Sequence, residues 1–199
     1  MAVLVRKEAP NFTAQAVFPD NSIKELNLKE YLKGKYGVIF FYPLDFTFVC
    51  PSEILAFSSK SEEFEKRDAK VIGISIDSQF THLAYRNTPT DKGGIGQVTF
   101  PLVSDLTHKI AADYDVLSDA GVALRGTFLI DKQGIVRHQI INDLPLGRNI
   151  EEAIRMVDAL QYSEKHGEVC PANWKQGKEA MKPTQEGVAA YLKSNAGKI

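Results

Sequence analysis

Two cysteines are the residues best suited to chemistry in this chain of 199 residues. Cys50 ends a nearly continuous apolar run, FFYPLDFTFVC, and Pro51 follows it directly. Cys170 lies in the segment GEVCPANW and also precedes a proline, Pro171. A cysteine thiolate can act as a nucleophile or a metal ligand, whereas a free cysteine is more commonly a small buried hydrophobic residue. The residues around each cysteine must therefore decide its role.

Pro51 indicates that Cys50 lies at the start of a helix. Proline lacks an N–H and is tolerated only in a first helical turn, so Cys50 is expected at the cap or in that turn. Sulfur at such positions lies near the positive end of the helix dipole, which favours the thiolate. A more acidic thiol is also a weaker nucleophile, so acidity alone accelerates an attack only about two- to threefold. A fast enzyme built on Cys50 therefore needs groups that stabilise charge in the transition state.

Three residues are candidate partners of the Cys50 sulfur. Thr47, three residues earlier, carries a hydroxyl that can both donate and accept a hydrogen bond. Pro43 follows a buried strand and can shield the sulfur from water without adding a competing donor. Arg125 places a permanently charged guanidinium at the mouth of another buried strand. Each also has an ordinary structural explanation, namely a local cap for Thr47, a strand end for Pro43 and a surface ion pair for Arg125.

Short apolar runs predict the strands that must position these residues. They are rich in β-branched and aromatic residues and lack a polar–apolar alternation, which is typical of strands buried on both faces. The predicted strands span residues 37–42, 70–77 and 126–131. The segment DKQG between TFLI and IVRHQII predicts a hairpin turn, so one antiparallel pair joins the sheet.

Helical patterns alternate with these strands. Apolar residues recur at helical spacing, with charges on the opposite face, in residues 51–68, 78–87, 106–114 and 149–162. The alternation predicts an α/β fold with a central mixed β-sheet flanked by helices.

The composition changes after Tyr162. Residues 163–199 are polar and interrupted by glycine and proline, and they hold one short helical pattern at residues 185–193. We therefore expect one domain over residues 1–162 and a C-terminal extension over residues 163–199 that packs on another surface. A hydrophobic content of 44% in a chain of this length suits one sizeable core.

The overall charge and hydropathy exclude several classes of protein. The formal net charge of -1 gives no reason to expect nucleic acid or an acidic membrane surface as a partner. The amino-terminal apolar run is too short for a secretory signal, and no run reaches the roughly 18 residues of a membrane span. We expect a cytoplasmic protein in which any disulfide is transient and functional, because a reducing compartment keeps thiols reduced.

The spacing of the other reactive residues disfavours three further classes of site. Cys50 is followed by Pro-Ser-Glu, so the Cys-x-x-Cys motif of thioredoxin-like oxidoreductases is absent. KGGIGQ lacks the Gly-Lys-Ser/Thr ending of a phosphate loop, so its glycines indicate a turn. No metal and no cofactor are expected, because the histidines are scattered at His82, His108, His138 and His166.

Five segments, in order along the chain, resemble the peroxiredoxins. PLDFTFVC has Pro43, Thr47 and Cys50 at the spacing of the family's active-site signature. RGTFLID resembles its second active-site segment, GEVCPANW resembles the resolving-cysteine region of typical two-cysteine members, and NDLPLGRN and GGIG also match. The resemblance covers nearly the whole chain. It implies a thioredoxin-like fold and a thiol-dependent peroxidase acting on hydrogen peroxide and organic hydroperoxides.

The resemblance also implies a role for each candidate residue. Cys50 would be the peroxidatic nucleophile, and Arg125 would stabilise its thiolate and the charge developing on the peroxide. Thr47 would hydrogen-bond the substrate, and Pro43 would screen the sulfur from water. Glu53 resembles the carboxylate that orients Arg125, a task that matters because an untethered guanidinium loses its geometry.

The same resemblance implies that Cys170 is the resolving cysteine. It would form a disulfide with Cys50 of another subunit, in homodimers that assemble into a decameric ring. Thioredoxin or a flavoprotein disulfide reductase would return the electrons. The alternative from another class is a binding role, in which a large assembly acts as a holdase chaperone or relays a peroxide signal; both activities can coexist in one protein.

Overall fold

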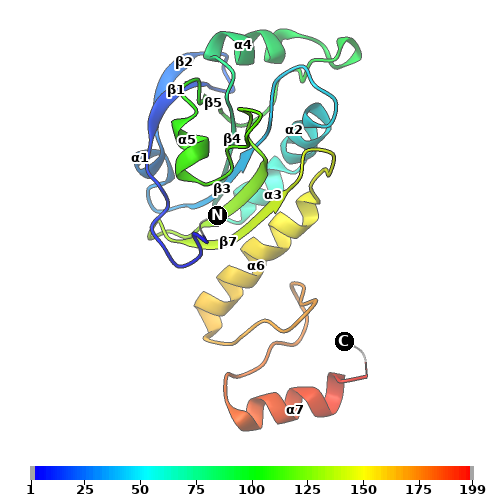
Figure 1. Ribbon diagram of the computed structural model, residues 1–199. Coiled ribbons are helices and arrows are strands. Elements are labelled where there is room, and N and C mark those ends of the chain that lie inside the picture. The colour runs from blue at the N-terminus through cyan, green and yellow to red at the C-terminus, as the bar shows by residue number, and fades with distance from the viewer. Residues whose placement is uncertain (1–2, 198–199) are drawn as a thin grey trace. The chain divides into compact units, whose positions relative to one another are not determined.

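A seven-stranded mixed sheet positions the candidate residues in the computed structural model, which describes residues 3–197 (Figure 1). In spatial order its strands are β2 (Ile23–Asn27), β1 (Thr13–Val17), β5 (Leu102–Ser104), β4 (Ala69–Ser75), β3 (Tyr36–Phe41), β6 (Arg125–Ile130) and β7 (Val136–Asn142). The pairs β3–β4 and β4–β5 are parallel. The pairs β1–β2, β1–β5, β3–β6 and β6–β7 are antiparallel. The predicted α/β class with a central mixed sheet is confirmed.

Most helices lie between strands along the chain, as the sequence pattern predicts, and the last two follow the final strand. They are α1 (Leu28–Leu32), α2 (Cys50–Ser59), α3 (Ser61–Lys66), α4 (Gln79–Asn87), the 3-10 helix η1 (Thr90–Lys92), α5 (Lys109–Asp113), α6 (Ile150–His166) and α7 (Gln185–Asn195). The predicted helix over residues 51–68 is in fact two helices, which meet at Lys60. Serines surround the break, and the Ser59 hydroxyl donates to the Ala56 carbonyl. Serine side chains compete with the backbone for such bonds, which weakens a helix locally.

The chain divides into two compact units, before and after the boundary at Ile150. The sheet and helices α1 to α5 form the first unit, and α6 from Glu151 onward and α7 belong to the second. This division joins α6 to the extension because the two make direct contacts, among them a hydrogen bond from Arg155 to the Trp174 carbonyl. The predicted division into a domain over residues 1–162 and a functional extension over residues 163–199 stays a prediction. Within residues 3–197, no helix is both long and apolar enough to cross a membrane.

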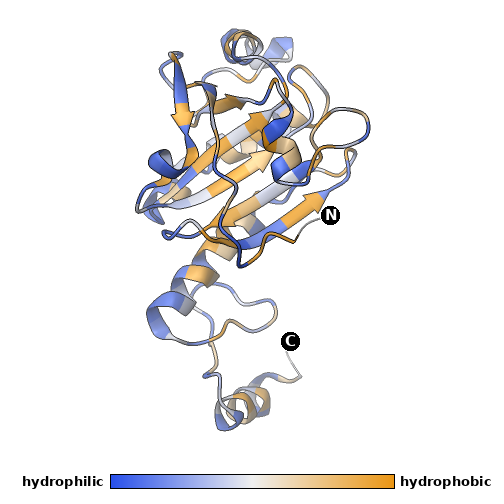
Figure 2. Ribbon diagram, turned by 60° about the vertical axis from the view of Figure 1, so that its left-hand side comes forward, coloured by the Kyte–Doolittle hydropathy of each residue, from blue (hydrophilic) through white to orange (hydrophobic). Residues whose placement is uncertain are grey.

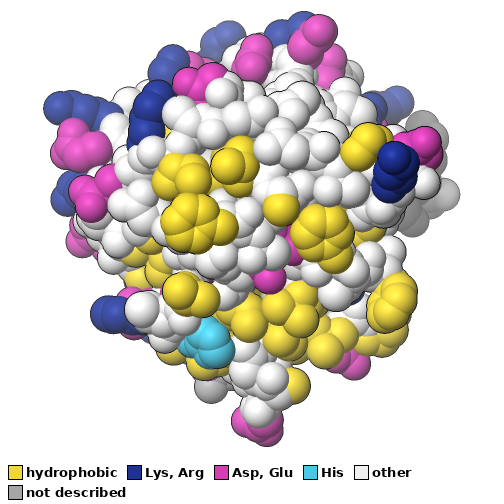
Figure 3. All heavy atoms as spheres, turned by 90° about the horizontal axis from the view of Figure 1, so that it is seen from above, with side chains coloured by type: hydrophobic (Ala, Val, Ile, Leu, Met, Phe, Trp, Pro, Cys, Tyr) yellow, Lys and Arg dark blue, Asp and Glu magenta, His cyan; other side chains and the backbone are white. Residues whose placement is uncertain are grey.

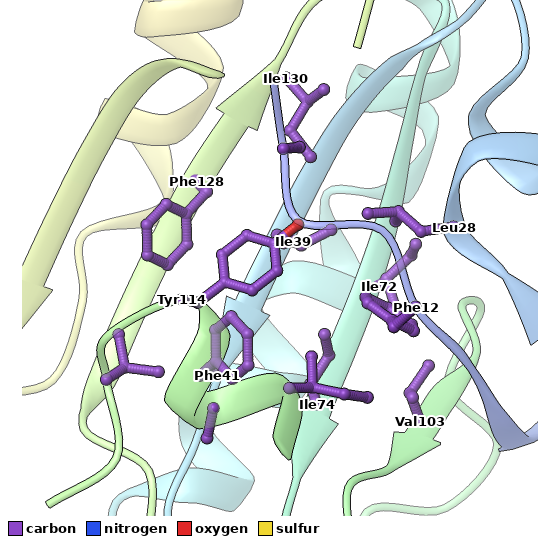
Figure 4. Close-up of a cluster of buried hydrophobic side chains, with 14 of the residues drawn as sticks. Phe12, Leu28, Ile39, Phe41, Ile72, Ile74, Val103, Tyr114, Phe128 and Ile130 are labelled. Atoms are coloured by element: carbon purple, nitrogen blue, oxygen red, sulfur yellow. The ribbon is translucent and has the colours of Figure 1, made fainter. Parts of the chain in front are cut away.

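The central strands are buried on both faces, which explains why their sequences lack a polar–apolar alternation. All six residues of β3 and all six of β6 are buried. Figure 2 shows hydrophobic residues gathered along the strands of the sheet. One face packs around the side chains in Figure 4, which include Ile39, Phe41 and Phe128. Burying each such side chain contributes about 1.5–3 kcal/mol.

The opposite face of β3 holds the helix that begins at Cys50. The Phe40 ring of β3 stacks on the Phe57 ring of α2, with centroids 4.2 Å apart. Phe100 meets Phe40 edge-on at 5.5 Å. Such aromatic pairs contribute about 0.5–1.5 kcal/mol beyond their buried area. Aromatic packing of Phe57, in the last turn of α2, therefore holds this helix against the sheet.

The segment GGIG forms a turn, as expected, and its glycines have two different structural roles. Gly93 and Gly96 have φ of 80° and 60°, in the left-handed region that favours glycine. A Cβ on Gly93 would meet nothing within 4 Å. A Cβ on Gly94 would lie 2.0 Å from the Thr88 carbonyl oxygen. No residue with a Cβ fits at position 94 unless the backbone moves.

We therefore predict that Gly94→Ala destabilises the protein more than Gly93→Ala. Overpacking at Gly94 should cost about 2–3 kcal/mol. The left-handed conformation alone should cost about 1 kcal/mol at Gly93. Urea unfolding of the two reduced variants measures the difference. Equal losses of stability would show that the turn relaxes around the added methyl group.

Candidate active site

Cys50 is the first residue of α2, with Val49 at the cap and Pro51 in the first turn. The position predicted from Pro51 is therefore confirmed. The thiol is free and fully buried, with 0% of Cys50 exposed. The site lies where β3 and β6 bring α2 and Arg125 together.

Two donors converge on the Cys50 sulfur. The Thr47 hydroxyl donates to Sγ at 3.0 Å, and Arg125 Nη1 lies 3.4 Å from Sγ. The Thr47 hydroxyl also lies 2.7 Å from the Leu44 carbonyl, and its single proton can serve only one acceptor at a time. Donors to a sulfur favour its charged form, so this pair stabilises the thiolate.

Glu53 holds Arg125 in place, one turn after Cys50 on α2. Its Oε2 accepts from Arg125 Nη1 at 2.7 Å, and both side chains are almost fully buried. Arg125 is the first residue of β6, and its Nε donates to the Leu144 carbonyl at 2.7 Å. The guanidinium plane is therefore fixed by a carboxylate on one element and a carbonyl on another. This is the contact that the sequence resemblance implied for Glu53.

Arg148 is a further buried member of this network that the sequence analysis did not single out. It donates to both oxygens of Glu53, through Nε and the backbone N–H at 2.9 Å and through Nη2 at 2.8 Å. Its Nη1 donates to the Phe41 and Gly126 carbonyls at 2.7 and 3.0 Å. Burial lowers the pKa of Arg148, and the Glu53 carboxylate opposes that change.

The charges of this network favour an anion at Cys50. Two guanidinium groups and one carboxylate leave one net positive charge in a buried site. A thiolate brings the group to neutrality, whereas a thiol leaves the positive charge uncompensated. Because an uncompensated buried charge is costly, the network stabilises the thiolate through its net charge as well as through hydrogen bonds.

The loop before Cys50 is tied to α4 by a buried histidine. His82 Nδ1 lies 2.7 Å from Asp45 Oδ2, and its Nε2 lies 3.2 Å from the Val103 carbonyl. The Tyr42 hydroxyl donates to Asp45 Oδ1 at 2.8 Å. Burial raises the pKa of Asp45, and the hydrogen bond with His82 opposes that rise. His82 is thus a core histidine with partners at both nitrogens, and it anchors the loop that carries Thr47.

Asp45, Asp77 and His82 have ligand atoms within 4.8 Å of one another, as a metal site requires. These groups already have protein partners, because Asp77 Oδ2 accepts from the Asp45 backbone N–H and the Ser75 hydroxyl. The cluster is therefore accounted for by hydrogen bonds within the fold.

The remaining two candidates lie in different settings. Pro43 is buried just after β3, and the role of screening the sulfur stays a prediction. Cys170 belongs to the second unit, where its thiol is free and partly buried. Its Sγ lies 3.5 Å from the Ala159 carbonyl of α6. The structure thus brings Cys50, Thr47, Arg125 and Glu53 together.

Comparisons with known proteins cover the same regions. Residues 5–139 match the AhpC/TSA family, and residues 159–194 match the C-terminal domain of 1-Cys peroxiredoxin. Alkyl hydroperoxide reductase C of Helicobacter pylori (strain ATCC 700392 / 26695) is 54% identical over 99% of this chain and 100% of that protein. Peroxiredoxin-1 of Gallus gallus is 54% identical over 94% of each chain. The crystal structure of the reduced 2-Cys peroxiredoxin of Plasmodium vivax aligns with a TM-score of 0.95 at 51% identity, covering 97% of this chain and 100% of that one.

Proposed function

Because the chain belongs to the AhpC/TSA family of peroxiredoxins, and is therefore a thiol-dependent peroxidase, we propose that Cys50 is its peroxidatic nucleophile and Cys170 its resolving thiol. The observation that carries the first assignment is the pair of donors, Thr47 and Arg125, on a buried sulfur at a helix start. The second assignment is supported by the thiol in the segment that matches a peroxiredoxin C-terminal domain.

In the first step the Cys50 thiolate attacks the terminal oxygen of a hydroperoxide. The S–O bond forms as the O–O bond breaks, and two electrons pass from sulfur to the peroxide. The leaving oxygen takes a proton and departs as an alcohol, or as water when the substrate is hydrogen peroxide. Arg125 is placed to stabilise the charge that develops on the oxygens, and Thr47 to hydrogen-bond the substrate.

In the second step Cys170 attacks the sulfenic acid of Cys50. The S–S bond forms, the S–O bond breaks, and the hydroxyl group leaves as water. A disulfide needs its two Cα atoms within about 7 Å, and Cys50 is fully buried in the first turn of α2. That turn must therefore open before a second sulfur reaches Cys50. We assign the attacking Cys170 to another subunit. On this assignment residues 1–162 form the peroxidase domain, and residues 163–199 form the C-terminal extension that supplies the resolving thiol.

This assignment predicts a covalent dimer. Peroxide-treated protein should migrate as a dimer on a non-reducing gel, and either Cys50→Ser or Cys170→Ser should abolish that band, because each removes one of the two sulfurs. Treatment with dithiothreitol should return the monomer. An oxidised band that stays monomeric would mean that the bond forms within one chain.

The disulfide needs an external dithiol to complete the cycle. We assign this role to thioredoxin or a flavoprotein disulfide reductase, and the requirement for a thiol donor fits a cytoplasmic site of action. Peroxide-dependent NADPH oxidation, measured with each reductant system in turn, identifies the donor. No turnover with either system would refute this part of the proposal.

Exposed aromatic side chains support self-association. Phe48 in the loop before Cys50 is 97% exposed, and Phe80 of α4 is 68% exposed. Figure 3 shows hydrophobic side chains gathered on one face of the molecule. Such patches mark interaction sites on soluble proteins. Homodimers assembled into a decameric ring fit this face, and its hydrophobic character also fits the second candidate function, a holdase role.

A further inference from the structure

The segment that carries Cys170 is tied to α6 at two adjacent turns. Cys170 Sγ lies 3.5 Å from the Ala159 carbonyl, and Arg155 Nη1 donates to the Trp174 carbonyl at 2.9 Å. Residues four apart on a helix lie on the same face. Residues 170–174 therefore lie along the face of α6 that presents positions 155 and 159.

Arg155 is itself held by a carboxylate. Its Nε and Nη2 donate to Glu152 Oε2 and Oε1 at 2.6 and 2.7 Å, in a two-pronged ion pair. This geometry leaves Nη1 directed at the Trp174 carbonyl. The hydrogen bonds that Arg155 donates to the Glu152 carboxylate raise the pKa of Arg155, so its charge is permanent. A carboxylate thus orients Arg155, as Glu53 orients Arg125, but Arg155 contacts the Cys170 segment through the Trp174 carbonyl.

The thiol of Cys170 lies among groups of opposing effect. Burial raises the pKa of Cys170, the Arg155 guanidinium opposes that rise, and the Glu168 carboxylate adds to it. The hydroxyl of Tyr162 on α6 donates to Glu168 Oε2 at 2.7 Å, and Glu152 accepts from Arg155. Since the thiolate is the attacking species, a nearby positive charge matters most when a thiol is mainly protonated at neutral pH.

We propose that Arg155, oriented by Glu152, is a positioning residue for the resolving step: it fixes the Cys170 segment on α6 and supplies the positive charge that favours the attacking thiolate. The inference rests on the proposed function, because it affects catalysis only if Cys170 resolves Cys50. Removing one adjacent charge should raise the thiol pKa by about one unit, which lowers the thiolate fraction about tenfold. Each remaining thiolate is about threefold more nucleophilic, because its thiol is less acidic. The two effects together should slow the resolving step about threefold at pH values below the pKa of Cys170.

The first experiment tests the charge directly and does not depend on resolution. In Cys50→Ser protein, Cys170 is the one remaining cysteine of the sequence. Its rate of alkylation by iodoacetamide is measured against pH for Arg155→Met and Arg155→Lys in this background. We expect the midpoint to rise by about one unit with methionine and by less with lysine, which keeps the charge. The matched control is Arg137→Met, which removes an arginine paired with Asp131 in the first unit. An unchanged midpoint in Arg155→Met overturns the proposal.

The second experiment separates this inference from the proposed function. Reduced protein is mixed with one equivalent of peroxide, and disulfide formation is followed by quenching with acid and non-reducing electrophoresis. Arg155→Met should consume its first equivalent at the parent rate and form the disulfide about threefold more slowly at pH 7. If Arg155→Met slows disulfide formation by the same factor at every pH, and Arg155→Lys restores none of the rate, the role of the positive charge is overturned. A disulfide that still forms in Cys170→Ser contradicts the proposed function instead, whatever Arg155→Met does.

Discussion

Replacing Cys50 with serine is expected to abolish peroxide reduction, whereas Cys170→Ser should consume about one equivalent of peroxide per subunit and then stop. The difference follows because Cys50 carries out the first step and Cys170 the second. Without Cys50 no thiolate lies between Thr47 and Arg125, and a serine hydroxyl is too weak a nucleophile to attack the O–O bond. Without Cys170 the first step proceeds, but the sulfenic acid has no thiol with which to condense.

The measurement is the peroxide that remains after reduced protein is mixed with a several-fold excess. Intact mass then shows whether one oxygen has been added in Cys170→Ser. The Cys50→Ser variant also separates the two candidate functions, because suppression of aggregation of a client protein can persist when peroxidase turnover is lost. Equal turnover in Cys50→Ser and the parent would place the nucleophile elsewhere in the chain.

Local constraints explain which parts of the fold and site could be predicted from the sequence. Pro51 restricts where a helix can begin, and α2 begins at Cys50. Continuous apolar runs mark strands covered on both faces, and β3 is buried at all six positions. The hairpin prediction is also confirmed, since β6 and β7 are antiparallel neighbours around the DKQG turn.

Short strands escaped prediction for a physical reason. The strand β5 has only three residues, and β1 is exposed at its first position and buried at its last two, so neither shows a clear period. Both are stabilised by pairing with each other rather than by a local pattern. As a result the sheet has more antiparallel pairs than the single hairpin predicted, and the small helix α1 was missed as well.

Arg148 shows the limit of such reasoning at the site. It lies 95 residues from Glu53 in sequence, and the contact exists only because β3 and β6 bring the two segments together. The segment NDLPLGRN pointed to this region, but nothing local distinguishes a buried arginine from a surface one. Charge balance was the one signal available from the sequence. If Glu53 neutralises Arg125, a second cation is needed to leave a positive charge for the Cys50 thiolate.

The Arg125→Lys variant should lose far more rate than conservation of charge suggests, by about 10²- to 10³-fold in the reaction with peroxide. Arg125 makes its contacts from a planar fork, with Nε on the Leu144 carbonyl and Nη1 shared between Glu53 and the Cys50 sulfur. One ammonium on a flexible stem cannot reach these acceptors and the peroxide oxygens together. Arg148 still holds Glu53 in the variant, so the carboxylate stays in place.

The matched control is Arg137→Lys, whose parent side chain is 39% exposed and pairs with Asp131 at 2.6 Å. Lysine keeps a positive charge beside the buried Asp131 carboxylate, and this pair lies outside the Cys50 network, so this variant should react within about twofold of the parent. Stopped-flow measurement of the first step gives both rate constants, and thiolate absorbance of Cys50 is recorded at the same pH. If Arg125→Lys keeps its thiolate but loses rate, the guanidinium acts on the transition state rather than on ionisation alone. A rate within twofold of the parent would remove the Arg125 guanidinium from the mechanism.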